Sequence, residues 1–142
     1  MNRVHSRRRA REIALQVLYE LECTQHAAAE VLAERLGEKP LDPASEAFAQ
    51  ELVTGVLAHR TELDDQIQKH APEWPLDQMA LIDHNILRLA LWEFSLGRLT
   101  PVKVAINEAV ELAKEFGSES APRFINGVLG SAAAEVAEAP PG

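Results

Sequence analysis

The first eleven residues hold a dense cluster of positive charge that could bind phosphates. Five arginines and no acidic residue occur there: Arg3, Arg7, Arg8, Arg9 and Arg11. The rest of the 142-residue chain has nine basic and 22 acidic side chains, a net charge of −13 against −8 for the whole. Because this acidic body would repel phosphates, the basic segment favours one local contact with a polyanion, first of all RNA or DNA.

Four of these arginines, at positions 7, 8, 9 and 11, fall in the first turns of a predicted helix. Positive charge is unfavourable there against the helix macrodipole, so local stability does not explain them. A solvated basic terminus without a ligand is the alternative, because such termini are common. Guanidinium groups favour an RNA ligand, since they pair with phosphate oxygens and stack on exposed bases.

Two phenylalanines could supply the flat surfaces on which unpaired bases stack. Phe116 and Phe124 flank residues 117–123, the junction of the last two predicted helices. Aromatic platforms are the second requirement of single-strand recognition. Core packing is the alternative for both rings, because apolar residues at helical spacing are usually buried.

Arg88 is the only cation in the apolar stretch from Ile86 to Leu91. Burying it without a partner would be costly, so it needs an acidic partner or a position at an edge. Glu93 lies five positions further on and is poorly placed for a pair on the same helix face. A salt bridge to another helix and a contact with an RNA phosphate both remain open.

Leu15 and Tyr19 lie on the side of the first predicted helix opposite its core stripe. Their spacing of four residues places them beside each other on one face. Three covers are open for this face: another helix of the chain, a second copy in a dimer, or a protein partner. An exposed aromatic residue is a suitable anchor for a partner.

The sequence contains no pattern typical of catalysis or metal binding. The five histidines have spacings that fit no metal site, and there is no glycine-rich phosphate loop, nucleophile elbow or Cys/His pair. The single cysteine, Cys23, has no second thiol for a disulfide. Asp83 and His84 are adjacent, so on a helix they point about 100° apart. We therefore expect a protein that is not an enzyme and needs neither a metal nor a cofactor.

Helical periodicity runs through the whole chain and predicts an all-α fold. We expect one compact domain over residues 1–137 and a disordered tail at 138–142. The bundle should contain seven helices, at approximately 6–24, 26–36, 44–59, 61–70, 77–97, 100–117 and from 120 to the tail. Since no apolar run approaches a membrane span and no signal peptide is evident, we expect a soluble, cytoplasmic protein.

Prolines and small polar residues set the predicted boundaries of these helices. The two prolines of residues 38–43 predict a loop, where the chain turns between two subdomains. Thr61 with Asp64 predicts a capped helix start, and Thr100 predicts another cap. Ser120 predicts the start of the last helix.

Two stretches of the sequence resemble the NusB family of bacterial transcription antitermination factors. One is the head SRRRAREIALQVLYELE, residues 6–22. The other is the block ILRLALWEFSLGRLTPVKVAINEAVELAKEFGSESAPRFINGVLGSAA, residues 86–133. They cover well over a third of the chain. The run TPVKVAINEAVELAKEFG followed by RFINGVLG is specific rather than generic helix.

The resemblance implies a fold of two perpendicular three-helix subdomains, with the loop near Pro40 between them. It implies an RNA-binding factor that binds the boxA element together with NusE, a small-subunit ribosomal protein. This complex would help RNA polymerase to ignore terminators, notably on ribosomal RNA operons. Family members occur as monomers and as homodimers, and a homodimer that covers the arginines would hide the RNA site.

The resemblance also implies where the contacts lie. The implied RNA contacts are Arg3, Arg7, Arg8, Arg9, Arg11, Arg88, Phe116, Ser120, Arg123 and Phe124. The implied contacts with a protein partner are Tyr19 and Asp83, and the shared helix face adds Leu15 beside Tyr19. Ser120 departs from the family, in which an acidic residue often stands there, and this change removes negative charge from the RNA face. The alternative function is a helical protein-interaction bundle without an RNA ligand, whose arginines would be dispensable for its binding.

Overall fold

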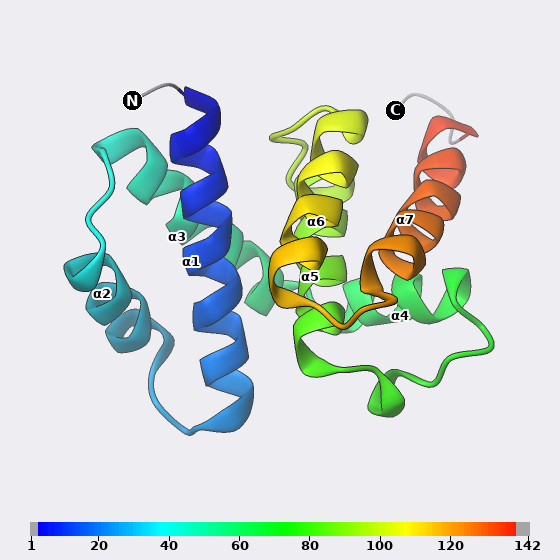
Figure 1. Cartoon of the computed structure of the whole chain (residues 1–142), viewed down its shortest axis with the longest axis horizontal. Coiled ribbons are helices and arrows are strands. Elements are labelled where there is room, and N and C mark those ends of the chain that lie inside the picture. Colours follow the sequence, from blue (N-terminus) through cyan, green and yellow to red (C-terminus); the bar gives the residue numbers. More distant parts are fainter. Residues whose placement is uncertain (1–2, 139–142) are drawn as a thin grey trace. The chain divides into compact units, whose positions relative to one another are not determined.

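The computed structural model describes residues 3–138 of the chain, with side chains described for residues 6–136. Regular structure in this range is helical throughout, which confirms the predicted all-α class (Figure 1). The seven α-helices are α1 (Arg3–Cys23), α2 (Ala28–Glu38), α3 (Pro43–Ala58), α4 (Arg60–His70), α5 (Leu81–Leu91), α6 (Val102–Phe116) and α7 (Ala121–Glu138). A 3₁₀ turn, η1 (Leu76–Gln78), precedes α5, and a π-helical turn, η2 (Trp92–Leu96), continues it.

The chain divides into two compact units, residues 1–58 and 59–142. This division lies between α3 and α4, so the prediction of a subdomain boundary at residues 38–43 was wrong. The segment after α2 instead connects α2 to α3 within the first unit, where α1 packs against both helices. The two prolines of residues 38–43 do lie at a break between helices. Whether such a loop also separates two units depends on how the helices on either side of it pack.

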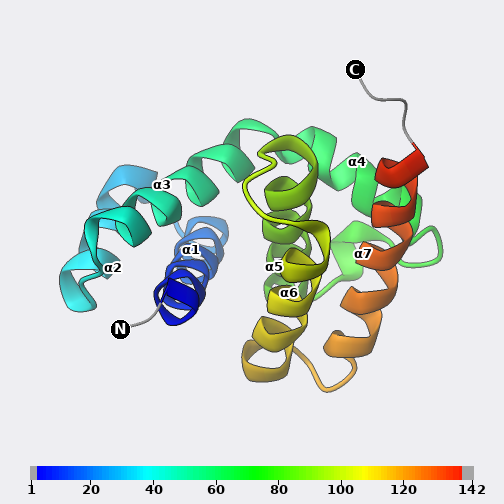
Figure 2. The ribbon, with the colours of Figure 1, turned by 90° about the horizontal axis from the view of Figure 1, so that it is seen from above.

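The first unit is built on the apolar stripe of α1. Ala14, Val17 and Leu18 are buried at the spacing of one helix face, and Leu52 and Val56 of α3 are buried with them. Figure 2 views α1 nearly end-on, with α2 and α3 beside it. An ion pair on the surface adds to this packing, because the guanidinium of Arg35 lies 3.0 Å from Glu20 and joins α2 to α1.

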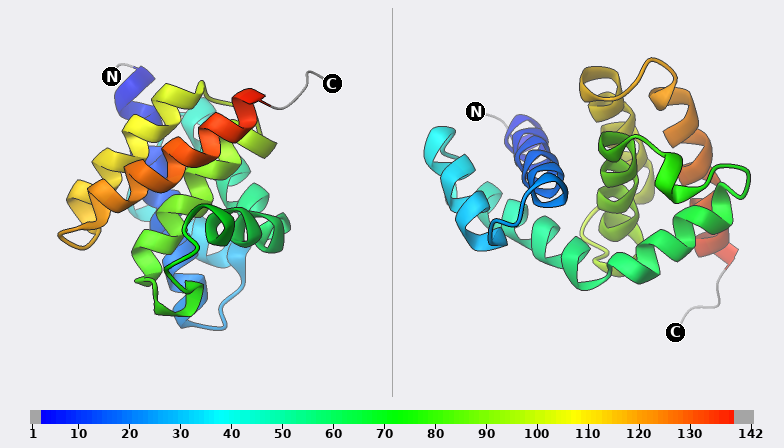
Figure 3. Two further views of the ribbon diagram at one scale, coloured as in Figure 1. Left: turned by 90° about the vertical axis from the view of Figure 1, so that its right-hand side faces the viewer. Right: turned by 90° about the horizontal axis from the view of Figure 1, so that it is seen from below.

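The second unit is organised around α5, whose residues from Asp83 to Leu91 are all buried. Helices α4, α6 and α7 each pack against α5, which fits the apolar character of this helix on nearly every side. Helices α6 and α7 lie side by side, as the left view of Figure 3 shows. Within residues 3–138, every helix falls short of the length and apolarity that a membrane span requires.

Two of the predicted helix starts differ from the structure. Helix α5 begins at Leu81 rather than near Asp77, because the chain after Pro75 first forms the 3₁₀ turn η1. Thr61 lies inside α4, whose N-cap residue is His59 with no side-chain cap, so the predicted cap at Thr61 was wrong.

Thr100 and Glu138 also differ from their predictions. The Thr100 hydroxyl donates a 2.7 Å hydrogen bond to buried Glu93, and Pro101 occupies the N-cap position of α6. Satisfying a buried carboxylate thus takes precedence over capping. Glu138 belongs to α7 rather than to a tail, and residues 139–142 lie outside the described residues.

Candidate functional site

Helix α1 arranges part of the arginine cluster against an aromatic ring of the first unit. Arg7 and Arg11 are four residues apart and therefore share a helix face. Their guanidinium carbons lie 4.4 Å and 5.1 Å from the centroid of the Phe48 ring in α3. Arg11 is only 3% exposed. Its guanidinium is used inside the unit, and the contact of Arg11 with RNA stays a prediction.

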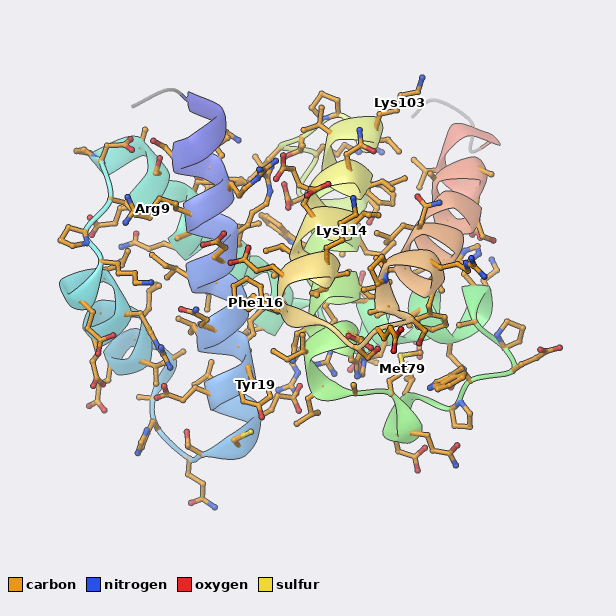
Figure 4. The ribbon with its side chains drawn as sticks, viewed as in Figure 1. Arg9, Tyr19, Met79, Lys103, Lys114 and Phe116 are labelled. Atoms are coloured by element: carbon orange, nitrogen blue, oxygen red, sulfur yellow. The ribbon has the colours of Figure 1, made fainter. Side chains whose placement is uncertain are left out.

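Arg7, Arg8 and Arg9 keep partial exposure. Arg7 and Arg9 line an open groove of about 580 Å³, whose other wall includes Pro40 and Asp42. Figure 4 shows Arg9 on the upper part of α1. Each of these arginines makes at least one interaction within the chain. These interactions hold the arginine side chains in defined positions. The side chain of Arg3 lies outside the described side chains.

The junction of α6 and α7 brings together four other residues that the sequence predicted as RNA contacts. Phe116 closes α6 and is half-buried, and Figure 4 shows it at the end of that helix. Ser120 precedes α7 and is exposed, as is Arg123 in its first turn. Phe124 follows and is half-buried. The exposed cation Arg123 beside the partly exposed ring of Phe124 is a combination that suits single-stranded nucleic acid.

Asp83 holds this junction in place from the first turn of α5. Its carboxylate accepts a 2.9 Å hydrogen bond from the hydroxyl of Ser118 and a longer bond, 3.4 Å, from the backbone N–H of Ser118. Asp83 is only 7% exposed. The Asp83 carboxylate therefore faces the α6–α7 junction of its own unit, and its contact with a protein partner stays a prediction.

Gly117 allows the chain to pass closely over Asp83 at this junction. A Cβ atom at position 117 would lie 2.8 Å from the carbonyl oxygen of Ala113 and 2.9 Å from the Asp83 carboxylate. We expect Gly117→Ala to lower the free energy of unfolding by about 1–3 kcal/mol, because backbone or buried atoms must move. Urea denaturation followed by circular dichroism measures the change.

Gly130→Ala is the matched control for this prediction. A Cβ atom there meets nothing within 4 Å, and the residue lies inside α7. Since alanine favours the helix over glycine, the control should stabilise the protein by up to about 1 kcal/mol. Equal effects of the two substitutions would contradict the close packing described for Gly117.

Arg88 forms an ion pair with Asp64, a partner in another helix that the sequence left unidentified. The Nε and Nη2 atoms of Arg88 donate to the two carboxylate oxygens of Asp64 at 2.8 Å and 2.9 Å. Nη1 donates to the side chain of Asn85 at 3.1 Å, and His84 Nε2 lies 2.7 Å from Asp64. This network joins α5 to α4, and it is the salt bridge to another helix that the sequence left open for Arg88.

The electrostatics of this pair affect the Asp64 carboxyl strongly. Desolvation by burial raises its pKa, but the hydrogen bonds and positive charges of Arg88 and His84 together outweigh that effect. The pKa of Asp64 is therefore held well below its usual range. The group stays ionised through the neutral range, as its pairing with Arg88 requires.

The two residues predicted for a partner surface on α1 have different environments. Leu15 is fully buried, so its cover lies within the chain, which is one of the three covers that the sequence left open. Tyr19 is 41% exposed near the end of α1 (Figure 4). Only the second of the two can anchor a partner in this structure.

Two residues of the site were missed by reasoning from sequence. Phe48 is buried in α3, and its ring also receives the two arginines. Trp74 was not considered, although it is 51% exposed and its ring centroid lies 5.7 Å from that of Phe124. Its position between Pro72 and Pro75, in a loop, was a usable signal, because a large aromatic residue in a polar turn has no periodic reason to be there.

The described side chains form no group of three His, Cys, Asp or Glu residues that could hold a metal ion. Titratable side chains instead form ion pairs that connect one helix to another. Lys69 and His70 at the end of α4 both reach Glu135 of α7 at 2.8 Å. The geometry of the site is that of a binding surface.

Comparisons with known proteins agree with this interpretation. The sequence model of the NusB family matches residues 8–134. The transcription antitermination protein NusB of Roseiflexus sp. (strain RS-1) is 50% identical over 127 residues, which cover 88% of this chain and 89% of that protein. The NusB protein of Bacillus subtilis (strain 168) is 43% identical over 130 residues, 92% of this chain and 96% of that protein.

A solved structure gives the same result at the level of the fold. A crystal structure of the antitermination factors NusB and NusE in complex with double-stranded RNA aligns with a TM-score of 0.84 and 27% identity. The alignment covers 92% of this chain and 98% of the solved one. With a family match over most of its length and relatives up to half identical, the chain belongs to the NusB family of transcription antitermination factors, which are RNA-binding proteins and not enzymes.

Proposed function

We propose that this chain, together with NusE, binds the boxA element of RNA and supports processive transcription of ribosomal RNA operons in the cytoplasm. The observation that carries the proposal is the arginine cluster of α1. The cluster is positively charged, although the whole chain has a net charge of −8. Helix α1 and the Phe48 ring hold its arginine side chains in defined positions. Such a cluster attracts phosphates to one place on an otherwise acidic surface.

The RNA contacts in this proposal come from both units of the chain. The first unit contributes Arg7, Arg8 and Arg9, with Arg3 ahead of them in α1. The second contributes Ser120, Arg123 and Phe124 of the α6–α7 junction, with Phe116 at its edge. Arginines bind phosphate oxygens and the rings stack on bases, so the contacts of each unit suit single-stranded RNA. The serine at position 120 adds no negative charge to this face.

Transcription in a purified system tests the proposal. A template carries boxA ahead of a terminator, and the fraction of transcripts that pass the terminator is measured with RNA polymerase, the accompanying antitermination proteins and NusE. Adding this chain should raise read-through on the boxA template and leave a template with scrambled boxA unchanged. Equal read-through on both templates, with and without the chain, would rule the proposed role out.

Tyr19 is the proposed anchor for NusE, and Tyr19→Asp tests it. We expect NusE affinity to fall by about 30-fold or more, as for an aromatic hot spot, while RNA affinity changes less than twofold. Because NusE is a basic ribosomal protein, the added negative charge by itself would favour binding. Gln50→Asp, at an exposed position of α3, is the matched charge control. Calorimetry with purified NusE measures the NusE affinity of both variants. An unchanged NusE affinity of Tyr19→Asp would show that Tyr19 is not part of the interface.

A further inference from the structure

An open groove of about 410 Å³ lies on the second unit, between the loop after α4 and the first turns of α7. Trp74 and Pro72 line one side, and Arg123, Phe124 and Gly127 line the other. A Cβ atom added at Gly127 would meet nothing within 4 Å, so this side of the groove is unobstructed. The groove therefore combines two aromatic rings, a cation and free space.

Trp74 and Phe124 form an aromatic pair at the surface rather than in the core. Their ring centroids are 5.7 Å apart, with the ring planes tilted by 45°. Trp74 is 51% exposed, the largest exposed fraction among the large hydrophobic residues of the described chain. Exposing a tryptophan ring to water to this extent is energetically unfavourable. Such exposure is typical of a residue that a ligand covers.

The loop that carries Trp74 is held in one conformation by Gln68. The side-chain amide of Gln68 donates to the backbone carbonyls of Ala71 and Trp74, both at 2.9 Å, and its oxygen accepts from the N–H of Leu76 at 3.3 Å. The N–H of Trp74 also donates to the carbonyl of Ala71 at 3.1 Å. The indole ring is thus presented from an ordered turn, which lowers the entropy lost when a ligand stacks on it.

The charge beside the rings selects the kind of ligand. Arg123 is exposed, and among the described side chains none forms an ion pair with it. Glu73 at the opposite rim is the acidic group of the groove. A guanidinium next to two aromatic faces matches a nucleotide, whose base stacks while its phosphate pairs with the cation.

We propose that Trp74, Phe124 and Arg123 form a stacking site for one unpaired base of single-stranded RNA. This inference rests on the proposed function and extends it, because it adds Trp74 and the loop after α4 to the RNA surface of the α6–α7 junction. The base stacks on the exposed face of Trp74, and Arg123 binds the adjacent phosphate. Gln68 is a positioning residue that acts through the loop.

Tryptophan fluorescence of the full-length protein tests the site directly. The chain has two tryptophans, and Trp92 is buried at 8% exposure, so a ligand in the groove reaches Trp74 first. Single-stranded boxA RNA should quench the emission as it binds. Inorganic polyphosphate, a polyanion without bases, should bind the arginines yet leave the emission of Trp74 unchanged. The emission of the Trp74→Phe variant, which contains only Trp92, shows how much of the quenching comes from Trp74.

Affinity measurements by fluorescence anisotropy of labelled RNA complete the test. Trp74→Leu should weaken RNA binding by about 5- to 100-fold, the range for loss of one base–aromatic stack, whereas Trp74→Phe should stay within about threefold of the wild type. Leu99→Ala, at an exposed apolar residue outside the groove, is the matched control and should bind normally. Replacing one RNA nucleotide at a time by an abasic one should reproduce the affinity loss of Trp74→Leu at a single position of the RNA.

Each other outcome overturns the inference in a distinguishable way. Normal RNA affinity of Trp74→Leu, combined with a loss in the Arg7, Arg8 and Arg9 triple variant, leaves the proposed function intact but removes the stacking site. Equal quenching by polyphosphate makes the groove an anion site without base recognition. Loss of NusE binding with normal RNA affinity makes it a protein-docking surface. If the wild type binds no RNA at all, both proposals fail together.

Discussion

Replacing Arg7, Arg8 and Arg9 together by alanine should weaken the binding of single-stranded RNA by at least about 100-fold near 100 mM salt, since three charge-assisted contacts are removed. A plot of log affinity against log salt concentration should also become shallower by about 2, because each lost phosphate contact lowers the slope by about 0.7. Anisotropy titrations at four or five salt concentrations measure both quantities.

A control with equal loss of charge separates a local contact from a general effect of charge. Arg60, Arg98 and Lys103 are exposed basic residues of the second unit and lie outside the proposed surface. Their triple alanine variant should keep the wild-type slope and bind within about threefold. Equal losses in the two variants would mean that net charge, rather than the arginine cluster, governs affinity. Unchanged helix content by circular dichroism should accompany both, because the cation–π contact of Arg7 contributes only about 0.5–1 kcal/mol.

Asp64→Ala should lower the free energy of unfolding by about 3 kcal/mol, because it leaves the buried Arg88 guanidinium without its carboxylate. The Arg88 side chain is 6% exposed, so water cannot replace the lost partner fully. Asp65→Ala is the matched control on the same helix. Asp65 is exposed, and its replacement should change stability by no more than about 0.5 kcal/mol. Chemical denaturation followed by circular dichroism compares the two, and similar values would contradict a structural role for the pair.

The pH dependence of the same ion pair has a definite direction. The folded pKa of Asp64 lies below its unfolded value of about 3.9, so its stabilising contribution is complete above that value. The contribution is then lost as pH falls through the folded pKa. The difference in stability between the wild type and Asp64→Asn should therefore be large at pH 7 and shrink below about pH 4. A difference that stays constant from pH 7 to pH 3 would show that the carboxylate charge is not what stabilises the pair.

Helical periodicity was sufficient to predict the class and number of the α-helices, because each buries a face that recurs at the helix spacing. It did not locate every boundary. The start of α5 depends on a 3₁₀ turn after Pro75, and the role of Thr100 depends on Glu93, which is buried. Both are set by contacts made after the helices have packed, which a pattern within one segment does not contain.

The site shows the same limit more strongly. Arg88 was examined against Glu93 in the same helix, yet its partner Asp64 lies 24 residues earlier in α4. Arg11 meets Phe48, which comes from α3. The helix spacing left the cover of Leu15 open, and only the folded chain shows that this residue is fully buried. Charge composition did indicate the arginine cluster, because that signal needs no tertiary contact.

The most direct test of RNA recognition is a titration of labelled single-stranded boxA RNA and of a scrambled RNA with this chain, alone and with purified NusE. A double-stranded boxA probe in the same series distinguishes the form of RNA that is bound. The chain with NusE should bind single-stranded boxA more tightly than the scrambled strand, and the Arg7, Arg8 and Arg9 variant should lose this binding. Equal affinity for boxA and scrambled RNA, or binding that survives in the arginine variant, would contradict the proposed recognition of boxA.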